Sequence, residues 1–212
     1  MLNSYKTINN ESVAKIDIKK SKFIGAAAPA QSEEQALAFI EKICKKHQSA
    51  THNVYAYQIG QNDEIQRCND DGEPTKTAGK PILELIRKEE LKNVVVVVTR
   101  YFGGIKLGTG GLIRAYGQSA KEALVQAKIG YMQLLTNVEI TFDYTAHGKI
   151  ENYLNPLGVV KDTSFSDKVQ MCLMLKDDEI PKVRQQLLNI TSGELSFNIK
   201  EKEYIFKEDK DN

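Results

Sequence analysis

Short runs in which apolar and polar residues alternate occupy the first thirty positions of the chain, a pattern typical of β-strands. A different pattern starts at Ser32, where S-E-E-Q has the spacing of a capping box with Gln35 at its third position. Apolar residues then recur at helical spacing: Ala36, Leu37, Phe39, Ile40 and Ile43. The pattern predicts short strands followed by one amphipathic helix.

The stretch from 52 to 128 predicts further strands and helices. Residues 52–59 read as a strand that pairs with 64–68 across the turn GQND, and a polar loop covers 69–81. A short helix with Ile82, Leu85 and Ile86 on its inner face follows. The run 94–99 is apolar on both faces, which predicts a buried central strand. A helix over 111–128 carries small residues on one side, which would let it lie close to a sheet: Ser119, Ala120, Ala123 and Ala127.

The pattern changes near Gly130 and predicts a second domain. Strands are expected at 137–144, 159–165, 168–175 and 194–199 or 194–204, with helices at 148–155 and 179–188. The order βαββαβ is the ferredoxin-like arrangement. We therefore predict an α+β protein with a first domain at 1–130 and a second at 136–206, joined closely around 129–135.

Composition limits the classes of function. The 212 residues are 41% hydrophobic and 27% charged, with a net charge of +1, so anion binding would need a local patch. The polar N-terminus has no stretch of signal-peptide length, and the aliphatic run 94–98 is too short to span a bilayer. Cys44, Cys68 and Cys172 form no CxxC pair. We expect a cytoplasmic protein without membrane contact.

The stretch RYFGGIKLGTGGLIRAYG, 100–117, follows the buried strand and holds six of the 14 glycines. A strand, a glycine-rich turn and a helix can bind an anion at the helix N-terminus. The P-loop spacing fails, because Thr109 and Gly110 replace its Lys and Ser/Thr. The dinucleotide fingerprint fails at Ile113. An ordinary nucleotide site is therefore not favoured, and no cofactor is expected.

Two interpretations of this loop remain open. In the first, cations and aromatic rings of the loop bind phosphate and stack on bases. The residues assigned to this nucleic-acid or phosphate site are Arg100, Tyr101, Phe102, Gly103, Gly104, Lys106, Gly108, Gly110, Gly111, Arg114 and Tyr116. In the second, the aromatic residues belong to the core and the glycines serve only a tight turn.

The loop NDDGEPTKTAGKP, 69–81, is the second candidate. It can be a solvated turn, a partner for Arg100 or Arg114, or a ligand set for a hard cation; we assign no metal. The residues assigned to a cleft here are Asp71, Gly72, Glu73, Pro74, Lys76, Gly79 and Lys80. Opposite charges predict that 70–74 packs near 100–111, through Asp71 or Glu73 and Arg100 or Arg114.

No other catalytic arrangement is evident, and no catalytic residue is assigned. The sequence has no GxSxG elbow and no HExxH motif. His47, His52 and His147 fall in different expected elements, without metal-ligand spacing, and are interpreted as surface or core histidines.

The motifs DDGEPTKTAGKPIL, 70–83, and VVTRYFGGIKLGTGGLIRAY, 97–116, together resemble the IMPACT family, whose bacterial branch is called YigZ. The resemblance implies a first domain with the two-layer α/β fold of a small-subunit ribosomal protein's second domain, shared with elongation factor G and GHMP kinases. It implies a second domain like the late domains of elongation factor G. Eukaryotic members regulate translation through an additional N-terminal RWD domain, so their partner is not carried over.

The leading hypothesis is a non-catalytic, RNA- or ribosome-associated regulator of translation that holds phosphate through the glycine loop. The alternative is an enzyme acting on a phosphorylated small molecule in the cleft between the two motifs. A scaffold that binds a protein partner is a third possibility. The sequence identifies neither the RNA, the partner nor the oligomeric state.

Overall fold

The computed structural model describes residues 2–209 of the chain and has the expected α+β class. Contacts divide the described residues into two compact units, one formed by 2–132 with 206–209 and the other by 133–205. The first unit holds β1 (Ser4–Ile8), β2 (Ser12–Ile18), β3 (Ser21–Pro29), α1 (Glu33–Lys46), β4 (His52–Ile59), β5 (Ile65–Asn69), α2 (Gly79–Lys88), β6 (Val94–Tyr101) and α3 (Thr109–Gln126). No helix within 2–209 is long and apolar enough to cross a membrane.

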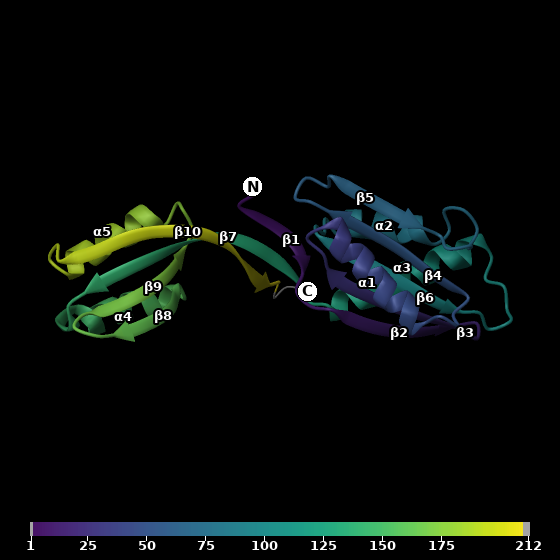
Figure 1. Ribbon diagram of the computed structural model, residues 1–212, viewed down its shortest axis with the longest axis horizontal. Coiled ribbons are helices and arrows are strands. Elements are labelled where there is room, and N and C mark those ends of the chain that lie inside the picture. The colour runs from purple at the N-terminus through teal and green to yellow at the C-terminus, as the bar shows by residue number, and fades with distance from the viewer. Residues whose placement is uncertain (1, 210–212) are drawn as a thin grey trace. The chain divides into compact units, whose positions relative to one another are not determined.

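The main sheet of the first unit has the strand order β2-β3-β6-β4-β5, and every neighbouring pair is antiparallel. Figure 1 shows these strands side by side with α1 across one face. Side chains alternate between the faces of a strand. Val94, Val96 and Val98 therefore pack with α2 and α3, whereas Val95 and Val97 pack with α1.

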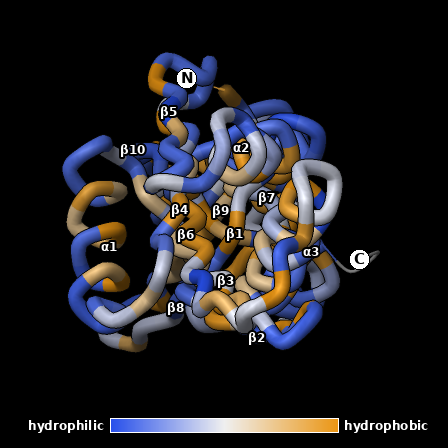
Figure 2. The backbone as a smooth tube through the Cα atoms, turned by 90° about the vertical axis from the view of Figure 1, so that its right-hand side faces the viewer, coloured by the Kyte–Doolittle hydropathy of each residue, from blue (hydrophilic) through white to orange (hydrophobic). Residues whose placement is uncertain are grey.

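Helices cover both faces of this sheet, as Figure 2 also shows with α1 on one side and α2 and α3 on the other. The resemblance implied two layers, and α1 supplies a third. The amphipathic pattern of α1 explains this arrangement. Ser32 caps the helix by accepting the Gln35 N–H, and four apolar side chains of α1 are buried against the sheet: Ala36, Phe39, Ile40 and Ile43.

Helix α3 lies unusually close to β3. A Cβ placed on Gly25 of β3 would lie 2.3 Å from the Ser119 carbonyl oxygen of the helix. Ser119, Ala120 and Ala123 are all buried, so the small side chains predicted from the sequence do face the sheet. The Ser12 hydroxyl donates to the Ala123 carbonyl at 2.6 Å and ties β2 to the same helix.

The second unit contains η1 (Tyr144–Ala146), α4 (His147–Leu154), η2 (Asn155–Leu157), β8 (Val160–Phe165), β9 (Val169–Leu175) and α5 (Ile180–Ile190), with parts of β7 (Ile129–Phe142) and β10 (Leu195–Glu208). Its strands are ordered β10-β7-β9-β8. Numbered within the unit, that order is 4-1-3-2, the ferredoxin-like arrangement expected from the sequence. Both helices share a core with β7 and β9.

The region expected to join two domains, 129–135, is instead the first half of β7. β7 and β10 each contribute residues to both units, and β1 pairs with β7. The division between the two units, at 132/133, falls inside this expected region and within a continuous strand. A Cβ at Gly130 would lie 2.3 Å from the Lys207 carbonyl oxygen, so this glycine permits close approach within a strand.

Candidate functional site

The acidic loop and the strand that leads into the glycine loop meet at a buried ion pair. Arg100 Nη1 lies 2.5 Å from Glu73 Oε1, and the two side chains are only 6% and 4% exposed. The Tyr116 hydroxyl of α3 donates to the same carboxylate oxygen at 2.8 Å. The predicted contact between the two motifs is confirmed, with Glu73 rather than Asp71 and with Arg100 rather than Arg114.

Aromatic rings enclose the Arg100 guanidinium. Its central carbon lies 5.4 Å from the centroid of the Phe23 ring and 5.2 Å from that of Phe102, within cation–π range. The Phe23 and Tyr116 rings meet edge to face at 5.3 Å. The strand register explains the arrangement. Arg100 of β6 is paired with Phe23 of β3 on one side and with His52 of β4 on the other. Paired residues project from the same face of the sheet.

The other acidic side chains of the loop fix its backbone. Asp70 accepts the N–H groups of Lys76, Ala78 and Gly79 at 2.8–3.1 Å, so it caps the start of α2 from nine residues upstream. Asp71 accepts the Asn53 N–H at 2.6 Å. Of the three interpretations left open for this loop, the contacts support the one in which its carboxylates pair with groups inside the protein. Within 2–209, no group of three or more His, Cys, Asp or Glu side chains could hold a metal ion.

A pocket of 440 Å³ lies between the two motifs. Glu73, Pro74, Arg100 and Phe102 line it, together with the first turn of α3. Gly108 is the N-cap of α3 at φ 72° and ψ 166°, a conformation restricted to glycine. Gly108 has no side chain with which to cap the helix, so its first N–H groups can receive an anion.

The structure separates the predicted phosphate residues into two groups. Arg100 and Tyr116 are 5% and 0% exposed and are paired with Glu73, so neither presents a free group to RNA. Both side chains hold the acidic loop, β6 and α3 together. The Tyr101 hydroxyl lies 3.0 Å from His47 Nδ1, on the α1 face of the sheet.

The second group remains at the surface. Phe102 is 46% exposed, Lys106 and Arg114 are exposed, and among the described residues neither cation has an ion-pair partner. Gly104, Gly108 and Gly110 are exposed, Gly111 is half-buried, and Gly103 donates its N–H to Ser21 at 3.1 Å. In the acidic loop Gly72, Pro74, Lys76 and Lys80 are exposed, whereas Gly79 is buried under Asn69.

His52 is a site residue that the sequence did not reveal. Its Nδ1 lies 2.7 Å from the Asp71 carbonyl oxygen and its Nε2 lies 3.8 Å from Glu73 Oε1. Ser21 and Thr51 were also missed; their hydroxyls accept the N–H groups of Gly103 and Phe102. Only the strand register brings these residues to the glycine loop, and a single sequence does not contain that register.

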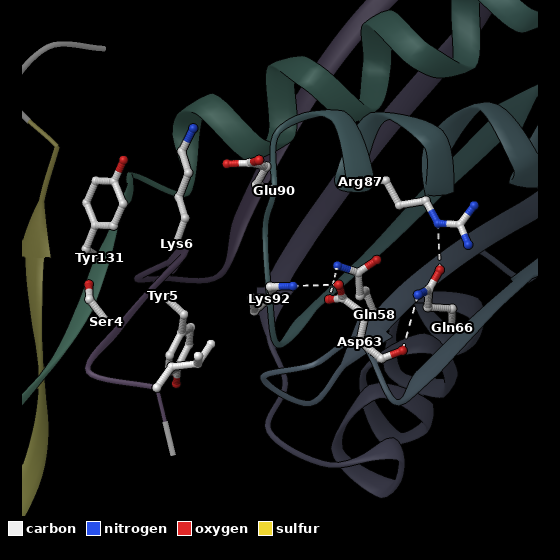
Figure 3. Close-up of a pocket in the computed structure, with 11 residues that line it drawn as sticks. Ser4, Tyr5, Lys6, Gln58, Asp63, Gln66, Arg87, Glu90, Lys92 and Tyr131 are labelled. Atoms are coloured by element: carbon white, nitrogen blue, oxygen red, sulfur yellow. Dashed lines mark hydrogen bonds and ion pairs between the residues drawn. The ribbon is translucent and has the colours of Figure 1, made fainter.

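A larger pocket of 590 Å³ elsewhere in the first unit contains neither motif. Figure 3 shows Lys92 and Gln58 directed at Asp63, and the guanidinium of Arg87 bonded to Gln66. Each of these side chains is paired with another, although the buried Gln58 Oε1 accepts no hydrogen bond among the described residues. The smaller pocket, where both motifs converge on a buried ion pair, is therefore the candidate functional site.

Comparison with known proteins agrees with the motifs. The Impact N-terminal domain matches 19–124, and a domain of unknown function, DUF1949, matches 140–194. The IMPACT family member YvyE of Bacillus subtilis is 43% identical over 98% of this chain and 95% of its own length. The chain belongs to the IMPACT family.

Two solved structures are similar to this IMPACT protein. One, described as a hypothetical protein, is 29% identical, covers 95% of this chain and 99% of its own, and superimposes with a TM-score of 0.61. The other is described as the two-domain translational regulator Yih1. It is 33% identical over 57% of this chain and 46% of its own, with a TM-score of 0.35.

Alkaline pH provides a test of the buried cluster. Burial raises the pKa of Tyr116 far above its usual value, and the Glu73 carboxylate beside the hydroxyl raises it further. An unfolded tyrosine ionises near about pH 10. The stability that comes from keeping Tyr116 neutral is therefore complete below about pH 10 and is lost as the pH rises above it.

Tyr116→Phe should remove this pH dependence together with the bond to Glu73. At neutral pH we expect the variant to lose about 1.5–3 kcal/mol of unfolding free energy, as for a hydrogen bond to a charged group. That deficit should shrink as the pH is raised past about 10. Urea unfolding of both proteins over this range measures it, and a deficit that stays constant with pH would contradict the assignment.

Proposed function

We propose that this IMPACT protein is a non-catalytic, cytoplasmic regulator of translation that binds RNA or the ribosome through the exposed part of its glycine loop. Family membership supports a role in translation, the function implied for eukaryotic members and stated for Yih1. The uncapped N-terminus of α3, flanked by Lys106, Arg114 and the exposed Phe102 ring, supports phosphate as the ligand. This surface is the observation that carries the proposal.

The buried cluster has a supporting role in this proposal. Glu73, Arg100 and Tyr116 connect the acidic loop, the central strand and α3 beneath the pocket. Phosphate binding is stronger when the hydrogen-bond donors are already held in fixed positions, because ordering a mobile loop on binding lowers the affinity. The cluster keeps the glycine loop in place, and Glu73 and Arg100 also line the pocket.

An enzyme acting on a phosphorylated small molecule is the second candidate. A 440 Å³ pocket is large enough for such a ligand, and His52 lines it next to the buried Glu73 carboxylate. A histidine with one nitrogen held by a carbonyl and the other near the pocket could transfer a proton. The experiment below separates the two candidates.

The leading proposal is tested by measuring the affinity for single-stranded RNA at several salt concentrations. With two to three phosphate contacts, the log–log slope of affinity against salt should be about −1.4 to −2.1. Arg114→Ala should weaken binding to all sequences and make the slope shallower by roughly 0.7. Lys121→Ala, which removes an exposed cation farther along the same helix, is the matched control and should leave the slope unchanged.

Two results would reject the proposal. One is the absence of RNA binding by the wild-type chain at low salt. The other is equal salt slopes for Arg114→Ala and wild type. The protein could fail to bind RNA while ATP or a sugar phosphate raises its melting temperature. In that case the enzyme hypothesis replaces the regulator hypothesis.

A further inference from the structure

The second unit carries an exposed aromatic cluster at the edge of its sheet. Phe165, at the end of the edge strand β8, is 60% exposed, and Tyr144 is 48% exposed. Their rings lie nearly parallel, with centroids 6.3 Å apart and 24° between the planes. Burying two such rings would be favourable, so their exposure points to a surface that another molecule covers.

Neighbouring side chains hold the cluster in a defined geometry. The Tyr144 hydroxyl donates to the Ser166 carbonyl at 2.6 Å, which fixes its ring against the turn after β8. His147 meets the Phe165 ring edge-on at 5.4 Å and stacks on the buried Phe142 ring at 6.4 Å. The four rings thus form a continuous series from the core to the surface. A rigid surface of this kind binds without first having to be ordered.

The surroundings favour a flat polar ligand over a protein surface. Positions next to the rings are polar or charged: Asp143, Ser164, Ser166, Asp167 and Lys168. Lys168 is exposed and lies in the same turn, where its carbonyl accepts the Ser166 N–H. Hydrogen bonds from Thr145 and the charge of Lys168 lower the pKa of Asp143, so the Lys168 ammonium is near that carboxylate. A stable protein interface needs about 800 Å² from each partner with an apolar centre, more than two rings supply.

We infer that Tyr144 and Phe165 form a stacking platform for an unpaired base of single-stranded nucleic acid, with Lys168 beside it for the adjoining phosphate. A base offers a flat π-face to the rings and carries a phosphate within reach of a neighbouring cation. The second unit thereby has a nucleic-acid contact of its own. The platform rests on the proposed RNA-binding function for its biological setting, although its residues are different ones.

The test uses the full chain and two oligonucleotides of equal length, oligoadenylate and the same backbone without bases. Phe165→Ala should weaken oligoadenylate binding roughly 5- to 140-fold, the equivalent of about 1–3 kcal/mol per stacked base. It should leave binding of the baseless backbone unchanged, and its salt slope should equal that of wild type. Phe165→Tyr, which keeps a ring, should retain affinity. Leu157→Ala, which removes an exposed apolar side chain outside the cluster, should have no effect.

The possible outcomes distinguish this inference from the proposed function. If Arg114→Ala weakens binding and Phe165→Ala does not, the platform is rejected and the glycine-loop site stands. If Phe165→Ala weakens binding and Arg114→Ala does not, the platform stands alone. If wild type binds neither oligonucleotide, both fail. Unchanged oligoadenylate binding together with loss of a protein partner by Phe165→Ala would make the cluster a protein-docking surface and overturn the inference.

Discussion

Replacing Glu73 with alanine is expected to lower the free energy of unfolding by about 3–5 kcal/mol. The carboxylate is buried against Arg100 at 2.5 Å and accepts the Tyr116 hydroxyl. Its removal leaves a guanidinium that is 5% exposed, with no counter-charge and with one nitrogen, Nε, already lacking a partner. A buried charge without a partner is the costly part of such a change, more than the lost attraction itself.

A double-mutant cycle measures this effect. Urea unfolding of Glu73→Ala, Arg100→Ala and the double variant should show that the double variant loses less stability than the sum of the singles, because removing both charges leaves none unpaired. The exposed pair Glu41–Lys45, at 2.6 Å on α1, is the control, and Glu41→Ala should cost at most about 0.5 kcal/mol. Small and additive losses for Glu73 and Arg100 would contradict the role given to this ion pair.

The contact between the acidic loop and the glycine loop could be predicted, because the two carry opposite charges. That Glu73 and Arg100 would be the two partners could not be predicted. Strand alternation decides that Arg100 shares a face with Val94, Val96 and Val98, beneath α3. Lys106 and Arg114 lie beyond the strand end and stay exposed. The sequence places three cations in one loop, and the fold buries one of them and leaves two at the surface.

Local patterns in the sequence predicted most helices and strands. Contacts between residues far apart in the sequence were not predicted. The capping box at Ser32 and the valine run of β6 are local signals, and both gave the correct element. The change of pattern near Gly130 predicted the boundary region 129–135, which contains the division between the two units, but it did not predict that Gly130 lies inside a strand. There the backbone of Lys207 approaches too closely for a side chain, and a contact between residues so distant in sequence leaves no local signal.

The aromatic cluster of the second unit illustrates the same limit. Tyr144 and Phe165 are 21 positions apart and belong to unrelated patterns, so nothing in the sequence pairs them. Residues paired across neighbouring strands share a face, and Phe165 lies opposite Val169, which is part of the core. Phe165 therefore projects from the face that carries α4, but at an edge that the helix does not cover.

Replacing Gly25 with alanine is expected to cost about 1–3 kcal/mol, toward the upper end of that range. The added methyl would lie 2.3 Å from the Ser119 carbonyl oxygen and 3.0 Å from its Oγ. The nearest atom belongs to the helix backbone, so no side-chain rotation relieves the clash and α3 must move away from β3. The same helix carries Gly108 at its N-terminus and Arg114 one turn further on, so the shift should also weaken RNA binding.

Gly117→Ala is the matched control, since Gly117 lies within the same helix and a Cβ added there would meet no atom of another element within 4 Å. An alanine there should stabilise the protein by up to about 1 kcal/mol, because glycine loses more backbone freedom than alanine in a helix. Chemical denaturation of the two variants should therefore give opposite signs. Equal and small effects would mean that α3 can move away from the sheet at little cost, and that close packing does not hold the turn at Gly108, the proposed phosphate site, in place.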